Sequence, residues 1–228
     1  MDTFAFLQGL RYIDTFFPSG SFAFSSGLET AVQEGAVQNS KDLHRYVTDY
    51  LLWGIGRCDA VALARAHGAV NSRDLKAMVE ADVELDSLKL CQETRAASCQ
   101  MGRSILQIAA DQKGSSPFLR NFREEMDSGR SPGHLAVVWG LTLGSFGWKR
   151  QEAIGAFLYQ TGVGFVSASY KLFPLGQREG QRLLESWAPV MESLSVGIAP
   201  NTPMTSWSPI HDIYAMRHTH LTTRLFRS

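Results

Sequence analysis

The sequence has no excess charge of either sign. Its 228 residues include 22 lysines and arginines and 22 aspartates and glutamates, so the formal net charge is zero. A protein that coats a nucleic-acid duplex needs an excess of basic side chains to displace counterions from the phosphates. An acidic disordered protein needs the opposite excess. The balance therefore excludes both classes and predicts no nucleic-acid partner.

Cysteines and long apolar runs are also scarce. Cys58, Cys91 and Cys99 are an odd number with no close pairing, which predicts no disulfide framework. The longest apolar stretch, Leu135 to Trp148, contains glycines and is shorter than the roughly 20 residues that span a bilayer. No basic segment precedes an apolar core at the N-terminus, as a secretory signal would require. We expect a cytoplasmic protein without a membrane partner.

Apolar residues make up 44% of the chain, and they recur at helical spacing without the strict alternation of strands. Seven helices are predicted from this spacing, with Ser40 and Ser72 as the first two N-caps. The helix after Pro132 is nearly all apolar and should be buried on every side. The expected ranges are 40–55, 72–83, 88–111, a stretch after Pro132, 151–172, 177–199 and a stretch after Pro209.

Two stretches rich in turn residues interrupt this pattern. Residues 18–22 form a Pro/Gly/Ser loop, and residues 199–209 contain three prolines, which are typical of a linker. We therefore predict an all-α domain of about eight to ten helices over residues 1–198. A linker and a C-terminal partner-binding tail follow at residues 199–228.

An acidic cluster is the strongest candidate for catalysis. Asp82 and Asp86 are four residues apart, so both carboxylates share one face of a helix. Paired aspartates at this spacing hold Mg²⁺ against a diphosphate in all-helical prenyl-chain enzymes. A Mg²⁺-dependent prenyl diphosphate enzyme is therefore the alternative function. The second metal-binding run of such enzymes is missing, which favours an ordinary solvated helix face.

Other motifs for metals, nucleotides and catalysis are missing. The sequence has no H-x-x-x-H, no C-x-x-C, no P-loop and no G-x-S-x-G nucleophile elbow. On a helix, His218 and His220 would point about 200° apart and could not share an ion. A transient Ni²⁺ or Zn²⁺ contact at the tail stays open. No catalytic residue, resident metal or cofactor is predicted.

Three segments have compositions that suit neither a plain core nor catalysis. The loop at residues 16–24 holds four phenylalanines among turn residues, which either anchor a partner or fold into the core. Residues 171–177 form a basic, proline-kinked corner between two predicted helices. The chain ends on apolar and arginine residues, although disordered tails are usually polar. A buried or partner-bound end is therefore expected.

Together these segments resemble the UreF family of urease accessory proteins, and the match spans nearly the whole chain. Each stretch is weak alone, but the ordered set is specific. In family order, the matching stretches are Phe17-Pro18-x-Gly20-Ser21-Phe22, Ser25-x-Gly27-Leu28-Glu29, Glu93-Thr94-Arg95-x-x-Ser98-x-x-Met101-Gly102-Arg103, Gly133-His134, Lys171-Leu172-x-Pro174-x-Gly176-Gln177-x-x-x-Gln181 and Arg224-Leu225-Phe226-Arg227-Ser228.

The resemblance implies an all-α homodimer with no enzyme activity of its own. Such proteins join UreD, also called UreH, and the GTPase UreG in a complex that delivers Ni²⁺ to the urease apoprotein. They are expected to modulate the GTPase cycle, and nickel passes through only transiently. The missing P-loop fits this division of labour, since the nucleotide belongs to the partner.

The resemblance also implies roles for particular positions. Those expected to face UreD/UreH are Phe22, Arg224, Leu225, Phe226 and Arg227. Those expected to face UreG are Lys171, Pro174, Gly176 and Gln177. The dimer seam is expected at Gly162, Phe165 and Tyr170.

Overall fold

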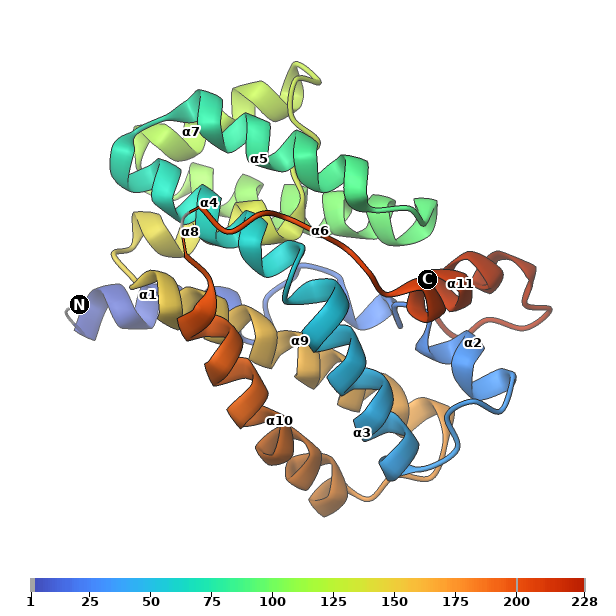
Figure 1. Ribbon diagram of the computed structural model, residues 1–228. Helices are drawn as coiled ribbons and strands as arrows, with labels where there is room; N and C mark the ends of the chain where they lie inside the picture. The colour runs from blue at the N-terminus through green and yellow to red at the C-terminus, as the bar shows by residue number, and fades with distance from the viewer. Residues whose placement is uncertain (1–2, 200, 228) are drawn as a thin grey trace.

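The computed structural model describes residues 3–199 and 201–227 (Figure 1). These residues form eleven α-helices and no β-strand, which confirms the all-α prediction. The helices are α1 (Thr3–Ile13), α2 (Leu28–Gln33), α3 (Ser40–Asp49), α4 (Asp59–Ser72), α5 (Leu75–Leu88), α6 (Gln92–Asp111), α7 (Pro117–Asp127), α8 (Leu135–Ser145), α9 (Arg150–Leu172), α10 (Gln177–Gly197) and α11 (Pro209–Arg217). Three short turns complete the elements: 3₁₀ turns η1 (Ser21–Ala23) and η3 (His218–His220), and the π-helical turn η2 (Tyr50–Ile55).

Helix α8 lies at the centre of the fold, between α4, α6 and α9. Every residue from Ala136 to Leu143 is buried, which confirms the expectation of a helix covered on all sides. Its approach to α4 depends on Gly140, where a Cβ atom would lie only 2.4 Å from the carbonyl oxygen of Leu63. Any larger residue at Gly140 would therefore push the two helices apart.

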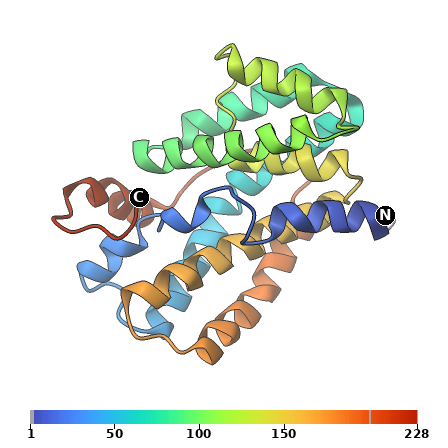
Figure 2. The same cartoon turned by 180° about the vertical axis from the view of Figure 1, so that it is seen from behind.

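Six further helices lie on two sides of α4 and α8. Helices α5, α6 and α7 form one side, and α3, α9 and α10 form the other (Figure 1). Helix α10 packs along α9 and α3, with the indole of Trp187 fully buried in that contact. In the reverse view, α1 extends from the body and α6 crosses above α9 (Figure 2). Within the described residues, no helix is both long and apolar enough to cross a bilayer.

The predicted helix starts need two corrections. Asn39, not Ser40, caps α3, because its side-chain oxygen accepts from the backbone N–H groups of Lys41 and Asp42. Asp74, not Ser72, caps α5, and Ser72 is instead the last residue of α4. Both errors arise because neighbouring residues compete for the same cap, and only the backbone geometry decides between them.

The C-terminal segment is docked on the helical domain. Residues before α11 run beside η2, where the backbone N–H groups of Thr205 and Trp207 donate to carbonyl oxygens. Helix α11 then packs against α2 and α6, and the end of the chain lies near α2 (Figure 1). Gly27 permits this contact: its φ is +83°, and a Cβ there would lie 2.9 Å from the backbone nitrogen of Ala215.

Candidate functional site

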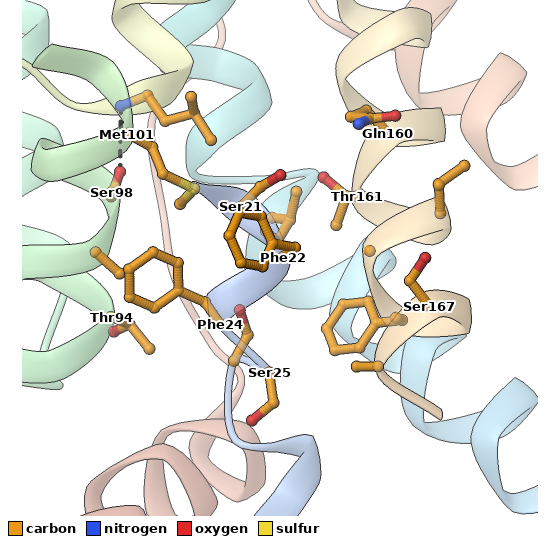
Figure 3. A pocket seen from close by; sticks show the side chains of 18 of the residues that line it. Ser21, Phe22, Phe24, Ser25, Thr94, Ser98, Met101, Gln160, Thr161 and Ser167 are labelled. Atoms are coloured by element: carbon orange, nitrogen blue, oxygen red, sulfur yellow. Dashed lines mark hydrogen bonds between the residues drawn. The ribbon is translucent and has the colours of Figure 1, made fainter. Parts of the chain in front are cut away.

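Segments that are far apart in the sequence meet around one open cavity of about 470 Å³. Helices α6 and α9 form its two walls, and the segment around η1 passes between them (Figure 3). Figure 3 shows the rings of Phe22 and Phe24 between Ser98 and Met101 of α6 and Thr161 of α9. The tail and the end of α9 complete the lining with Phe226 and Lys171.

The four phenylalanines of the N-terminal loop divide between two environments. Phe17 is buried, with its ring 4.8 Å from the ring of Tyr12, and Phe24 is half-buried at the cavity. Phe16 and Phe22 are 95% and 76% exposed. Phe17 therefore belongs to the core, whereas Phe16 and Phe22 lie on the surface, and their role as partner anchors stays a prediction.

An ion pair lies at one end of the cavity. The Lys89 ammonium lies 2.8 Å from Asp59, and both side chains are largely buried. Burial is the largest single effect and lowers the pKa of Lys89, but the charge and hydrogen bond of Asp59, together with Cys58 and Cys99, raise the pKa above its ordinary value. Burial raises the pKa of the nearby Cys58 thiol to about 12. The cavity thus offers apolar surface, hydroxyl groups and one neutralised ion pair.

Glu29 holds the tail onto the domain. Its carboxylate is completely buried and accepts hydrogen bonds from the backbone N–H groups of Leu225, at 2.7 Å, and Phe226, at 3.1 Å. The Nε2 atom of His218 lies 2.9 Å from the same carboxylate. One side chain of α2 therefore satisfies donors from two parts of the C-terminal segment.

His218 lies between two carboxylates and is itself fully buried. Its Nδ1 atom is 2.9 Å from Glu93, which also forms a 3.4 Å ion pair with Arg224. Glu93 belongs to α6 and Glu29 to α2, so this cluster joins two helices to the tail. A histidine that donates from both ring nitrogens suits this position.

The structure divides the residues expected to face UreD/UreH. Phe22, Arg224, Leu225 and Arg227 are exposed, whereas Phe226 is only 5% exposed because its ring lines the cavity. The backbone N–H of Arg227 donates to the carbonyl of Ala23, so the tail runs beside the N-terminal loop. These residues are brought to one region, although the loop and the tail are opposite ends of the chain.

The residues expected to face UreG form an exposed corner. Lys171 is near the end of α9, Pro174 and Gly176 are in the connection, and Gln177 begins α10; all four are exposed. The Lys171 ammonium lies 5.1 Å from the centroid of the Phe226 ring, within the range of a cation–π contact. The corner is therefore in direct contact with the tail.

The expected dimer seam is split by the fold. Gly162 and Phe165 are buried inside the chain: a Cβ at Gly162 would meet Met191 of α10, and the Phe165 ring packs against Tyr46. Tyr170 is 40% exposed on the other side of α9. A second copy could reach only the exposed residues of this part of α9, here called its outer face: Tyr159, Gly164, Ser167 and Tyr170, of which the last three also line the cavity.

Asp82 and Asp86 do not line the cavity described above. Asp82 is fully buried, so the expectation of a solvated helix face is wrong for this residue. Its carboxylate accepts from the Ser131 hydroxyl at 2.5 Å and from the backbone N–H groups of Gly133 and His134 at 2.6 and 2.9 Å. Burial raises its pKa, against the lowering effect of these bonds. The carboxylate is committed to holding a loop rather than to a metal–diphosphate site.

His211 of α11 joins the tail to both α3 and η2. Its Nε2–H donates to the Tyr46 carbonyl at 2.9 Å, and its ring stacks on Tyr50. Among the described residues, Nδ1 has no hydrogen-bond partner. Burial lowers the pKa of His211, opposed by the Tyr46 carbonyl and Asp49.

We expect this histidine to destabilise the fold in acid. The unfolded chain takes up the proton near its ordinary pKa of about 6.5, before the folded chain does. The free energy of unfolding is therefore unaffected by His211 above about pH 6.5, and it falls as the pH drops from there toward the lowered pKa of the folded state. His211→Gln should reduce this slope by up to about 1.4 kcal/mol per pH unit in urea unfolding. Equal slopes for the two proteins would contradict the expectation.

Two important residues were not predicted as site residues. Glu29 and Glu93 both belong to matched stretches, yet the sequence alone suggested no role for either. A weak signal existed for Glu29, because an acid directly after Leu28 in a short apolar helix has few routes to solvent. The sequence marks His218 only as a possible metal ligand, whereas its partners Glu29 and Glu93 are 189 and 125 residues away.

The fold and the site together define an all-helical protein whose loop, corner and tail meet at one cavity. The sequence model of the family named UreF matches residues 37–188. Urease accessory protein UreF of Actinobacillus pleuropneumoniae serotype 5b (strain L20) is 30% identical over 221 residues, covering 96% of this chain and 97% of that protein. UreF proteins of Bacillus sp. (strain TB-90) and of Nostoc sp. (strain PCC 7120) are each 29% identical, covering 97% and 98% of this chain.

The chain belongs to the UreF family of urease accessory proteins. It therefore has a role in urease maturation, together with other maturation factors.

Proposed function

We propose that this chain is a non-catalytic cytoplasmic adaptor in urease maturation. It binds UreD/UreH and the GTPase UreG in the complex that delivers nickel to the urease apoprotein, and it modulates the GTPase cycle. The observation that carries this proposal is the contact between the exposed tail and the Lys171 corner. Two surfaces expected to bind different partners meet there.

The tail has the features of a partner-binding surface for UreD/UreH. The Leu225 side chain is 63% exposed, while its backbone is fixed by Glu29. On α11, Ile210, Ile213 and Met216 are spaced three apart and all remain exposed. Exposed apolar groups on a fixed backbone support tight binding, since little conformational freedom is lost on association.

The corner has the features of a polar surface for UreG. Lys171 is an exposed cation whose charge could steer an acidic patch of a partner. Its contact with Phe226 ties this charge to the position of the tail. A partner that moves the tail would therefore alter the surface offered to the second partner. We further propose that two copies associate through the outer face of α9.

A pair of substitutions separates the two surfaces. The tagged full-length chain is co-expressed with UreD/UreH and UreG, and the captured partners are quantified. Leu225→Ser should lower UreD/UreH recovery by roughly tenfold, corresponding to about 1.4 kcal/mol. Lys171→Ala should lower UreG recovery similarly and leave UreD/UreH bound. Val196→Ser and Lys76→Ala are matched controls, because both residues are exposed elsewhere.

Each outcome has a defined meaning. Unchanged UreD/UreH recovery with Leu225→Ser would remove the tail from that interface. Unchanged UreG recovery with Lys171→Ala would show that the Lys171 corner is not part of the UreG interface. Loss of UreD/UreH with Lys171→Ala would show that Lys171 acts by holding Phe226, and not as a surface for UreG.

A further inference from the structure

A second polar cluster lies where the end of α5 meets α6 and the start of α8. It contains Asp86, Cys99 and His134, whose ligand atoms all lie within 4.8 Å of one another. The His134 ring is fully buried, and the other two side chains are half-buried. Asp86 keeps 33% of its side chain exposed, so a small ion can reach the cluster from solvent.

The separations match those of a metal-binding site. The Nε2 atom of His134 lies 3.1 Å from an Asp86 oxygen and 3.9 Å from the Cys99 sulfur. Around a tetrahedral ion with bonds of about 2.0–2.3 Å, neighbouring ligand atoms lie roughly 3.3–3.6 Å apart. The Cys99 sulfur lies 3.5 Å from the other ring nitrogen, Nδ1, and all three ligand atoms lie within 4.8 Å of one another. Shifts of up to about one ångström would therefore bring the three atoms to tetrahedral separations. Rotation of the two half-buried side chains supplies such shifts.

The surroundings orient the imidazole for this role. The Ser98 hydroxyl lies 3.1 Å from Nδ1 and accepts from the Leu135 backbone N–H at 3.2 Å, the contact drawn dashed in Figure 3. Both ring nitrogens of His134 have a hydrogen-bond partner when the Ser98 hydroxyl donates to Nδ1 and Nε2–H donates to Asp86. The cation would take the place of the proton between His134 and Asp86. A second polar partner that fixes the ring is typical of metal-binding histidines.

Charged neighbours limit the affinity. Arg95 lies 3.8 Å from Asp86. Burial, followed by Lys89, lowers the pKa of His134, so the ring is neutral and can accept a cation. Burial raises the pKa of the Cys99 thiol to about 11, so a cation must displace its proton. Such a site suits exchange rather than permanent retention.

We propose that Asp86, Cys99 and His134 bind a borderline divalent cation of the Ni²⁺, Co²⁺ and Zn²⁺ class. One thiolate, one imidazole and one carboxylate suit these ions better than Mg²⁺ or Ca²⁺, which prefer oxygen ligands. The site does not depend on the partner surfaces above, because it is complete within one chain. In a urease accessory protein, Ni²⁺ is the cation of interest.

Cobalt titration of the isolated full-length chain under reducing conditions tests this site. We expect one equivalent of Co²⁺ to produce a sulfur-to-cobalt charge-transfer band, which Ni²⁺ and Zn²⁺ abolish by competition. Cys99→Ser should remove the band and weaken Co²⁺ binding at least tenfold. Cys91→Ser is the matched control, because this buried thiol lies about two helical turns before Cys99 and outside the cluster. It should leave the band intact.

Ser98→Ala tests the orienting role of the hydroxyl and should weaken binding about tenfold with the band retained. Circular dichroism confirms that each variant is folded. A band that persists in folded Cys99→Ser, or no band in the natural protein at excess Co²⁺, would overturn the proposal. Neither result would bear on partner binding, which is measured separately.

Discussion

Replacing Glu29 with alanine is expected to release the C-terminal tail and to lower the free energy of unfolding by about 3–5 kcal/mol. The substitution removes the acceptor for two backbone N–H groups and for Nε2–H of the buried His218 ring. Donors left unpaired in the interior are costly, so the tail should detach and return them to water. Detachment limits the loss of stability to the free energy of tail docking.

Hydrogen exchange at the amides of Leu225 and Phe226 measures tail release directly. In Glu29→Ala both amides should lose their protection, while the amides of α8 keep theirs. Glu34→Ala is the matched control: Glu34 follows the same helix and joins α11 through a 2.8 Å ion pair with Arg217, but that pair is exposed. Glu34→Ala should lower the free energy of unfolding by less than about 1 kcal/mol. If both amides kept their hydrogen-exchange protection in Glu29→Ala, Glu29 would not be the residue that holds the tail.

The limits of sequence analysis are clear from the helices. Apolar stripes located α3, α5, α6, α9 and α10, because each of these helices buries its apolar face. The stripe also located α11, but there Ile210 and Ile213 are exposed, and His211 and Ala215 are the buried residues. Helix α4 was missed because nine of its residues are buried on several sides, which erases the stripe. Helix α7 was missed although it carries a Ser116 cap, Pro117 at its first position and apolar residues at helical spacing. That signal was present in the sequence and could have been found.

The candidate site shows a different limit. The sequence identified the loop, the corner and the tail as unusual segments. It could not show that they meet, because their contacts join residues separated by more than 50 positions. The contact between Lys171 and Phe226 and the bonds from Glu29 to the tail depend on how α2 and α9 pack. Spacing along one helix carries no information about such partners.

The pair of aspartates illustrates the same point in detail. Helical spacing correctly places Asp82 and Asp86 on one helix four residues apart, but it does not say what covers them. The loop at residues 131–134 covers Asp82, while Asp86 remains partly exposed beside His134. Two carboxylates one turn apart therefore lie in different environments: Asp82 holds a loop, and Asp86 pairs with His134 and Arg95 at a partly exposed position.

Asp82→Ala is expected to be the most destabilising of the substitutions considered. The carboxylate holds Ser131, Gly133 and His134 in place, and thereby fixes the entry into the central helix α8. Water cannot easily reach the donors of this loop, because the loop packs tightly against α6. A Cβ at Gly102 would lie only 2.1 Å from the Gly133 carbonyl oxygen. Three donors would remain buried without an acceptor. We expect a loss of about 5 kcal/mol, near the upper end for such changes.

Thermal unfolding checks this expectation. For a chain of this size, such a loss lowers Tm by roughly 10 °C or more. Asp82→Asn should recover only part of the lost stability. Its amide oxygen can still accept, but its NH₂ group would face hydrogen-bond donors of the loop instead of accepting from them. Glu80→Ala on the same helix is the control, since its 3.7 Å ion pair with Lys76 is exposed. A stable Asp82→Asn protein with the natural Tm would show that the loop needs no carboxylate. That result would favour a role for Asp82 in function rather than in stability.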